Sequence, residues 1–175
     1  MKLLFKSLLL IVIFFYALIA FMPKENIYYL LQEKLSHRRI DIVTKTIDDK
    51  YLKFFLKENT IYYMKIKAVN IKNIDTKVFL YDNTIIIKNI SIDKSFKHIV
   101  PSSIKNIIIR YKITNPLKIT IKAKMDSANL VGYIDIVKRK LILNLKTSKT
   151  FVRKYKNIIN KMKKTPKGYS FEYKF

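Results

Sequence analysis

Side chains that carry chemistry in proteins are few in this sequence and lie far apart. There is no Cys, and His37 and His98 have no spacing that would place two metal ligands on one helix turn. The closest carboxylates, Asp48 and Asp49, lie beside Lys50 in a polar stretch, which is more typical of a turn than of acid–base catalysis. With only two Gly, the chain has neither a phosphate-binding glycine loop nor a nucleophile elbow. We therefore expect no enzymatic activity, no metal and no cofactor.

The N-terminus is long and apolar. Residues 3–22 contain one charge, Lys6, and a helix of 20 residues spans about 30 Å, the thickness of the hydrocarbon core of a bilayer. A cleavable signal peptide would need a shorter apolar region and small residues before the cut, for which Ala17 and Ala20 are misplaced. We expect residues 1–22 to form an uncleaved transmembrane signal-anchor helix.

Basic residues flank this apolar segment on both sides. More basic residues follow the segment than precede it, and the positive-inside rule therefore favours a body in the cytoplasm. However, a short N-terminal tail commonly stays in the cytoplasm while the domain after the segment is exported. We predict export, which gives a single-pass protein of a bacterial inner membrane with its body in the periplasm. The flanking residues are Lys2 and Lys6 before the segment, and Lys24, Lys34, Arg38 and Arg39 after it.

Residues 23–36 follow as a predicted juxtamembrane amphipathic helix. Pro23 suits a first helical turn, and apolar residues then recur at helical spacing. Tyr28 and Tyr29 fit either a membrane interface or a packed core. The recurring apolar residues are Ile27, Leu30, Leu31 and Leu35.

Beyond residue 37 the apolar residues alternate with polar ones, which is the pattern of strands with one buried face. We predict an α+β fold in which residues 37–175 form a β-rich extracytoplasmic domain, a mostly antiparallel curved sheet of about seven to nine strands. A terminal strand follows Gly168. The alternating runs cover residues 62–68, 107–113, 117–123 and 141–145, and the turn signals are Glu58-Asn59, Asp82-Asn83, Asn115-Pro116 and residues 138–140.

Residues 151–162 fit an amphipathic helix, with Ser148 or Thr150 as its cap. Its basic face would suit a membrane surface, but a sheet with one apolar face needs a cover, so we expect the helix to pack on the sheet.

The motif IKNI occurs at residues 71–74, 87–90 and 104–107. A chain rich in Ile, Lys and Asn produces such copies by chance, yet their starts lie 16 and 17 residues apart, about one strand plus its turn. The copies are therefore expected to mark similar points on successive strands.

The chain has 36 Lys or Arg against 12 Asp or Glu and a net charge of +24. Such a charge suits an anionic membrane or nucleic acid, and aromatic residues alternate with Lys over residues 51–67 as in a base-stacking platform. The same stretch has the composition of β-strands, and Arg, the better phosphate ligand, is scarce. Nucleic acid binding is kept as a third hypothesis, behind envelope protein partners and lipid.

The order of these features resembles the type II secretion protein N family and its AsmA-like relatives. One stretch that carries the resemblance is the boundary at Phe21 and Pro23 with the amphipathic helix after it, and the other is residues 132–149, a glycine-led strand, a basic turn and a leucine-alternating strand. The resemblance implies a bitopic inner-membrane protein whose periplasmic curved sheet serves an envelope secretion or lipid-transport assembly as a structural or scaffolding component.

A curved sheet with one apolar face also offers a groove for the acyl chains of a phospholipid, with basic residues near anionic headgroups. If the C-terminal helix seals the sheet, the same apolar residues are core instead. For headgroups we single out Lys34, Arg38 and Arg39. The predicted groove lining is Ile107, Ile109, Tyr111, Ile119, Ile121, Ile134, Leu141 and Leu143.

Overall fold

The computed structural model describes residues 2–96, 101 and 103–175, and these contain one large antiparallel sheet and four helices. This confirms the predicted sheet. The helices are α1 (Lys2–Phe21), α2 (Glu25–Ser36), α3 (Lys149–Lys154) and α4 (Lys156–Ile159), with a 3-10 turn at Lys94–Phe96. The strands are β1 (Ile40–Lys50), β2 (Lys53–Tyr63), β3 (Ile66–Lys77), β4 (Asp82–Ile92), β5 (Ser103–Lys112), β6 (Lys118–Met125), β7 (Ala128–Asp135), β8 (Lys140–Thr147), β9 (Lys163–Thr165) and β10 (Gly168–Lys174).

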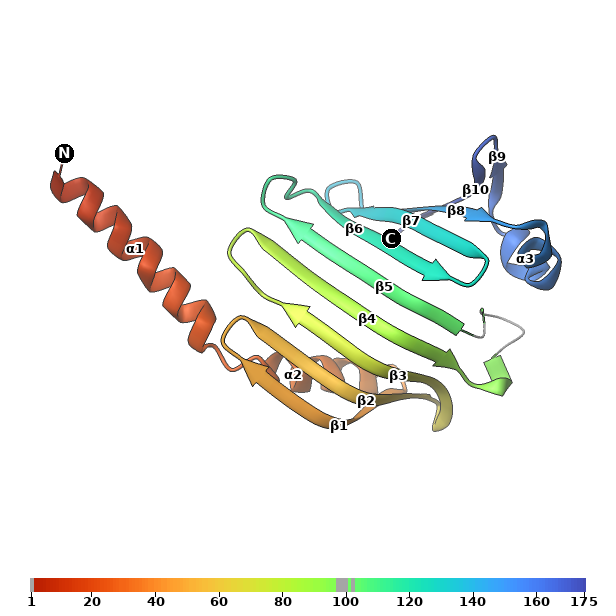
Figure 1. The fold of residues 1–175 in the computed structure, drawn as a ribbon, viewed down its shortest axis with the longest axis horizontal. Helices are drawn as coiled ribbons and strands as arrows, with labels where there is room; N and C mark the ends of the chain where they lie inside the picture. The colour runs from red at the N-terminus through yellow and green to blue at the C-terminus, as the bar shows by residue number, and fades with distance from the viewer. Residues whose placement is uncertain (1, 97–100, 102) are drawn as a thin grey trace.

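The ten strands form a meander in the order β1-β2-β3-β4-β5-β6-β7-β8-β10-β9, in which every pair is antiparallel (Figure 1). Only the last step departs from sequence order, because β10 inserts between β8 and β9. The short strand β9 directly follows the predicted helix at residues 151–162 and was not predicted, so the strand count exceeds seven to nine. The terminal strand after Gly168 is confirmed as β10.

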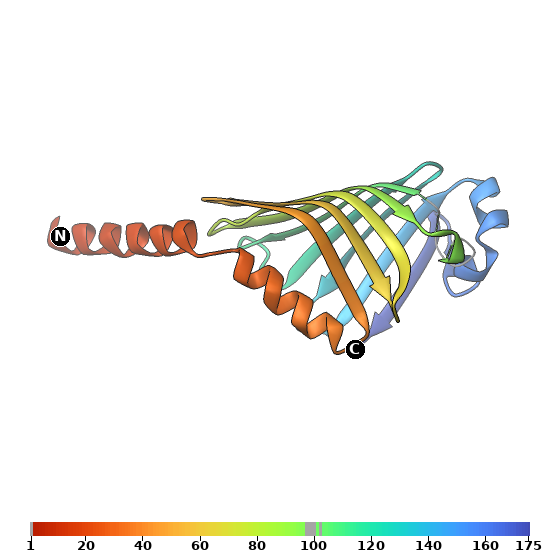
Figure 2. The ribbon, with the colours of Figure 1, turned by 90° about the horizontal axis from the view of Figure 1, so that it is seen from below.

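The sheet is curved, and α2 lies on its concave side below β1 and β2 (Figure 2). Tyr28 on α2 is buried against Phe54 and Leu56, and its hydroxyl donates to the Ile42 carbonyl at 3.4 Å. Tyr29 is exposed. Of the two roles left open for these tyrosines, Tyr28 therefore has the core role.

The N-terminus of α2 is fastened to the sheet by Asp49 at the end of β1. The Asp49 carboxylate accepts from the Lys24 backbone N–H at 2.9 Å and from the Lys24 ammonium at 3.2 Å. A carboxylate at a helix N-terminus is favourable because the first N–H groups have no partner within the helix. The Lys24 side chain is almost completely buried.

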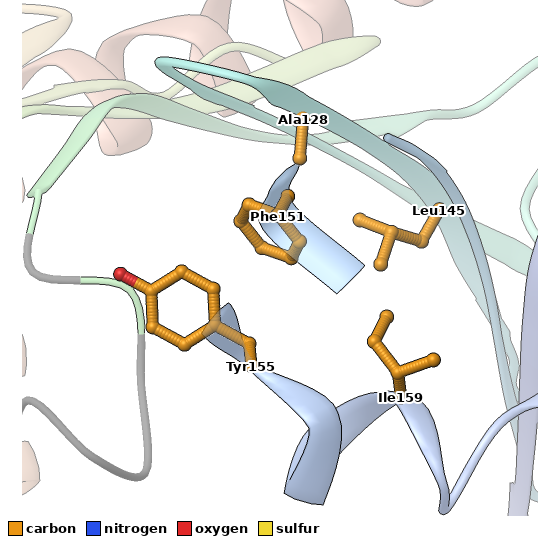
Figure 3. Packing of buried hydrophobic residues seen from close by; sticks show 5 residues of the cluster. All are labelled: Ala128, Leu145, Phe151, Tyr155 and Ile159. Atoms are coloured by element: carbon orange, nitrogen blue, oxygen red, sulfur yellow. The ribbon is translucent and has the colours of Figure 1, made fainter. Parts of the chain in front are cut away.

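The C-terminal helical segment packs on the sheet as expected, but it is broken into α3 and α4 at Tyr155. The predicted cap is confirmed, since the Ser148 hydroxyl accepts from the Phe151 N–H at 3.3 Å. Phe151, Tyr155 and Ile159 pack on Ala128 of β7 and Leu145 of β8 (Figure 3). This segment covers one corner of the sheet and does not seal it.

The three IKNI copies lie side by side in β3, β4 and β5. In the strand pairing Ile71 is opposite Ile90, and Ile90 is opposite Ile104. The other isoleucine of each copy aligns in the same way, Ile74 with Ile87 and Ile87 with Ile107. All six pack in one hydrophobic cluster, so the expectation of equivalent points on successive strands is confirmed.

The two isoleucines of each IKNI copy are three residues apart, and this spacing reflects an interruption of the side-chain alternation in the strand. In a regular strand residues i and i+3 point to opposite faces, yet both isoleucines of each copy lie in the same cluster. Between them the ladder skips one position, at Lys72 in β3, Asn89 in β4 and Lys105 in β5, and the neighbouring strand β2 makes the same skip at Glu58. Glu58 and Asn89 have left-handed φ values of 54° each. We call this row of residues the crease.

The crease explains one wrong prediction. Glu58-Asn59 was expected to be a turn, but it lies within β2, where positive φ at Glu58 reverses the side-chain phase without ending the strand. The alternation over residues 62–68 was also taken as one strand, whereas β2 ends at Tyr63 and β3 begins at Ile66. Met64 and Lys65 between them have φ of 50° and 67°, the pattern of a type I′ turn.

Two of the other turn signals agree with the structure, whereas Asp82-Asn83 was expected to be a turn and lies within strand β4. Asn115-Pro116 lies in the turn between β5 and β6, and residues 138–139 lie in the turn between β7 and β8. Asp82-Asn83 begins β4 directly after a turn. The stretch 51–67, with its interleaved aromatic residues and Lys, forms β2, its two flanking turns and the start of β3, which confirms its β character.

Candidate functional site

The predicted groove residues lie together on the concave face of the sheet. Ile109 is opposite Ile121, Tyr111 is opposite Ile119, and Ile134 lies between Ile119 and Leu141 in the strand pairing. Each of the eight is half-buried, so they are neither sealed in a core nor fully solvated. The residues are Ile107, Ile109 and Tyr111 of β5, Ile119 and Ile121 of β6, Ile134 of β7, and Leu141 and Leu143 of β8.

Gly132 lies in the middle of this face, between Ile121 and Leu143 in the strand pairing. A Cβ atom there would lie 2.2 Å from the Ile142 carbonyl oxygen and 2.7 Å from a methyl group of Leu143. Such distances are far inside van der Waals contact. Glycine is therefore needed for the close approach of β7 to β8, and no side chain projects from the concave face at this position.

One end of the concave face forms a cavity beneath α2. Its volume is about 290 Å³, and it extends from the helix across four strands to Ile109, one of the predicted groove residues. Nearly all of its wall is apolar. The lining comprises Lys24, Ile27, Tyr28, Leu31, Ile42, Phe54, Leu56, Ile74, Thr76, Val78, Ile85, Ile87 and Ile109.

The other end of the face forms a second cavity, of about 550 Å³, beside α4. Leu143, another predicted groove residue, lines it together with Leu130 and Phe171. Lys161 and Asn157 lie at its edge as the polar groups of the lining. The predicted residues thus form an apolar surface that joins a cavity at each end. We call this surface with its two cavities the apolar groove.

The apolar groove is long enough for an acyl chain. The groove runs across the strands, which lie about 4.8 Å apart, so the three steps from Ile109 of β5 to Leu143 of β8 cover about 14 Å before the cavities are added. The hydrocarbon core of a bilayer is about 30 Å thick for two leaflets, so one acyl chain extends about 15 Å. Along β5 to β8 the described residues on the concave side are apolar or uncharged, and water there is displaced favourably by a hydrocarbon chain.

Charged side chains occupy the convex side of the sheet. The Lys88 ammonium is 2.7 Å from the Asp75 carboxylate, Arg110 binds Asp82 through two nitrogens, and Lys118 lies over the Tyr133 ring. The Arg110 guanidinium, by hydrogen bonding, lowers the pKa of Asp82 to about 2. The two faces of the sheet therefore differ in polarity, as the alternation predicted.

The predicted headgroup ligands lie elsewhere. Lys34, Arg38 and Arg39 are exposed at the C-terminal end of α2 and the start of β1, at the end of the helix opposite to its junction with α1. At roughly 1.5 Å per residue, Lys34 lies about 14 Å along the helix from its N-terminal end, and Arg38 and Arg39 follow the whole helix of about 18 Å. Their role in binding headgroups stays a prediction.

The residues first considered for chemistry are used structurally or lie apart. Asp49 binds Lys24, and Asp48 lies 3.7 Å from the Lys50 ammonium. His37 is exposed at the end of α2, whereas His98 lies outside the described residues. Among the described residues no group of three His, Asp or Glu is placed to hold a metal ion.

Sequence reasoning missed the part that α2 plays in the apolar groove. Ile27 and Leu31 were recognised as one apolar stripe of a helix, but no pattern showed that this stripe faces Phe54 and Leu56 of β2. The signal present was the alternation within β2, where Phe54 and Leu56 share a phase. Which helix covers which strand depends on the tertiary fold, which alternation does not encode.

The N-terminal helices α1 and α2 differ in how far their length and hydropathy suit a membrane span. Among the described residues no single helix meets the length and hydropathy expected of one, while Phe5–Phe21 and Glu25–Ser36, bent by 60° at the break between them, meet these criteria as a pair.

Comparison with family models, curated proteins and solved structures found no match. The resemblance to the type II secretion protein N family and AsmA-like proteins therefore stays a prediction.

Proposed function

We propose that this protein is a non-enzymatic, membrane-anchored lipid-binding component of a bacterial envelope secretion or lipid-transport assembly, in which the apolar groove holds acyl chains. The observation that carries the proposal is the continuous apolar concave face, half-buried in the monomer and bounded by a cavity at each end. Large exposed apolar surfaces are costly in water and mark binding sites.

The anchor is the second part of the proposal. Residues 7–22 have no charge, and the large apolar side chains of α1 are exposed along its length. Such a surface is stable in lipid, where every backbone group of a helix is already paired. In the proposed topology α1 spans the inner membrane and the sheet lies in the periplasm.

A structural or scaffolding role is the second candidate, and the open sheet edge favours it. The outer side of β1 has no strand beside it in the described chain, and beyond the Ile42 carbonyl, which accepts from Tyr28 and Gln32 of α2, it presents backbone donors and acceptors. A partner strand can extend a sheet at such an edge. Both roles can coexist in one assembly, since the edge and the concave face are different surfaces.

Mass spectrometry tests the proposal. A detergent-free preparation of residues 24–175, released gently into the gas phase, is expected to carry phospholipid mass. Ile121→Arg, which places a charge in the centre of the apolar groove, is expected to lose the adduct, whereas Lys122→Arg on the opposite face is expected to keep it. A lipid-free spectrum from a folded sample would contradict lipid binding and leave the scaffold role.

A further inference from the structure

Four β-hairpin turns lie at one end of the sheet. Because neighbouring strands are antiparallel, the turns β1–β2, β3–β4, β5–β6 and β7–β8 all emerge at the same end. Figure 1 shows them on the side of the sheet that faces α1. We call these turns, residues 51–52, 78–81, 113–117 and 136–139, the hairpin rim.

The hairpin rim exposes large apolar side chains. Turn residues of soluble proteins are mostly small or polar, because they are solvated. Here each turn of the rim carries at least one large apolar residue that is at least 47% exposed. These residues are Tyr51, Tyr81, Ile113, Leu117, Ile136 and Val137.

The hairpin rim also touches α1 well before that helix ends. The ring of Tyr16 lies 6.0 Å from that of Phe79 in the β3–β4 turn, in an edge-to-face contact. The ring of Phe21 lies 6.2 Å from that of Tyr51 in the β1–β2 turn. Since Tyr16 precedes the end of α1 by five residues, or roughly 7 Å of helix, the rim is level with the last turns of α1.

Basic residues flank the exposed apolar side chains. The four turns with the residues at their ends contain eight Lys or Arg and two Asp. Both carboxylates are engaged, Asp82 with Arg110 and Asp135 with the Lys138 backbone N–H at 2.9 Å. Tyrosine and aliphatic tips with cations beside them are the combination that favours the interface of an anionic bilayer.

We propose that the hairpin rim is a membrane-contacting surface that inserts its apolar tips into the interface of an anionic bilayer. This inference rests on the proposed anchoring by α1. Val78 of the β3–β4 turn and Ile85, the fourth residue of β4, also line the cavity beneath α2. Contact of the rim with the bilayer therefore places that end of the apolar groove directly at the lipid surface, where an acyl chain can enter it without crossing water.

Single-cysteine labelling of the full chain tests the rim, because the natural chain has no Cys. Val137→Cys and Tyr81→Cys place an environment-sensitive fluorophore on the rim, Ile13→Cys places it on α1, and Ile66→Cys places it on the opposite end of the sheet. Ile66 is a matched control, since it is 54% exposed beside a hairpin turn. Each protein is reconstituted into vesicles of phosphatidylethanolamine and phosphatidylglycerol, with or without nitroxide-labelled lipids.

The fluorescence of the rim labels is expected to shift to shorter emission wavelength and to be quenched by nitroxide lipids, as that of the α1 label is. The label at position 66 is expected to be quenched only by a water-soluble quencher. Pure phosphatidylcholine is expected to reduce the shift at the rim. Rim labels that behave like position 66 while the α1 label is quenched by lipid would overturn the rim and leave the anchor. An α1 label unquenched by lipid would overturn the anchor itself. A rim shielded in native membranes but not in these vesicles would assign the surface to a protein partner and overturn the lipid proposal.

Discussion

Asn59 is buried more deeply than Lys24, at 1% exposure, and it lies at the crease. Its amide nitrogen donates to the carbonyls of Leu56 at 3.2 Å and Ile71 at 3.3 Å, and its oxygen accepts from the Thr44 hydroxyl at 2.7 Å. Positive φ at Glu58 interrupts the ladder here, so backbone groups need other partners. The side chain of Asn59 supplies them.

Asn59→Ala is expected to lower the free energy of unfolding by about 1–3 kcal/mol, because buried carbonyl groups lose their donors. Asn70→Ala is the matched control, since Asn70 is exposed and accepts only from the Thr60 hydroxyl. It is expected to cost less than about 0.5 kcal/mol. Denaturant unfolding of the protein in detergent micelles measures both, and equal effects would mean that Asn59 does not support the crease.

The ion pair of Asp82 and Arg110 predicts a pH dependence. The pKa of Asp82 is lowered to about 2 in the folded protein from its ordinary value of 3.8, so the folded state favours the carboxylate. The stabilisation is complete above about pH 4 and is lost as the pH falls through about 2. The thermal unfolding midpoint of Asp82→Asn is expected to lie below that of the wild type at pH 7. The two midpoints are expected to converge as the pH approaches about 2. A difference independent of pH would contradict the assignment.

At the scale of elements, the docking of α2 determines whether the cavity beneath it exists. One contact is Tyr28 packed on Phe54 and Leu56 of β2, and the other is the buried Lys24 held by Asp49. Removing one partner of a buried ion pair leaves the other charge without compensation, which is more costly than never having had the pair.

Asp49→Asn is expected to destabilise the fold by less than the roughly 3–5 kcal/mol of a fully buried pair, because the Asp49 side chain is 22% exposed. The double variant Lys24→Met with Asp49→Leu is expected to recover most of the loss. The neighbouring Asp48→Asn is the control and is expected to cost below about 1 kcal/mol, since its pair with Lys50 is exposed. Denaturant unfolding distinguishes the three, and no rescue by the double variant would argue against a charge effect.

Elements with a simple period could be predicted from the sequence. Strict alternation over residues 117–123 and 141–145 gave β6 and β8, and the helical spacing of Ile27 and Leu31 gave α2. The crease could not be predicted as such, because positive φ at Glu58 and Asn89 depends on neighbouring strands that make the same break. The spacing of the isoleucines in IKNI was the sequence signal that reflected the crease. The break of the C-terminal helix at Tyr155 had no such signal.

At the scale of the whole molecule, the predicted groove residues could be assigned to one face because alternation fixes faces independently of the fold. Sequence could not determine whether that face was open, since this depends on how far α3 and α4 extend over it. They cover only the corner around Ala128 and Leu145. The cavity beneath α2 and the hairpin rim likewise depend on curvature and on the placement of α1, which long-range packing determines.

Photocrosslinking in the full chain tests lipid occupancy of the apolar groove most directly. A photoreactive amino acid at position 121 points to the concave face, whereas one at position 122, the next residue of β6, points to the convex face. Irradiation of cells followed by mass spectrometry of the purified protein is predicted to show phospholipid attached at position 121 and none at position 122. Equal lipid attachment at both positions, or none at position 121 in correctly folded protein, would contradict the account.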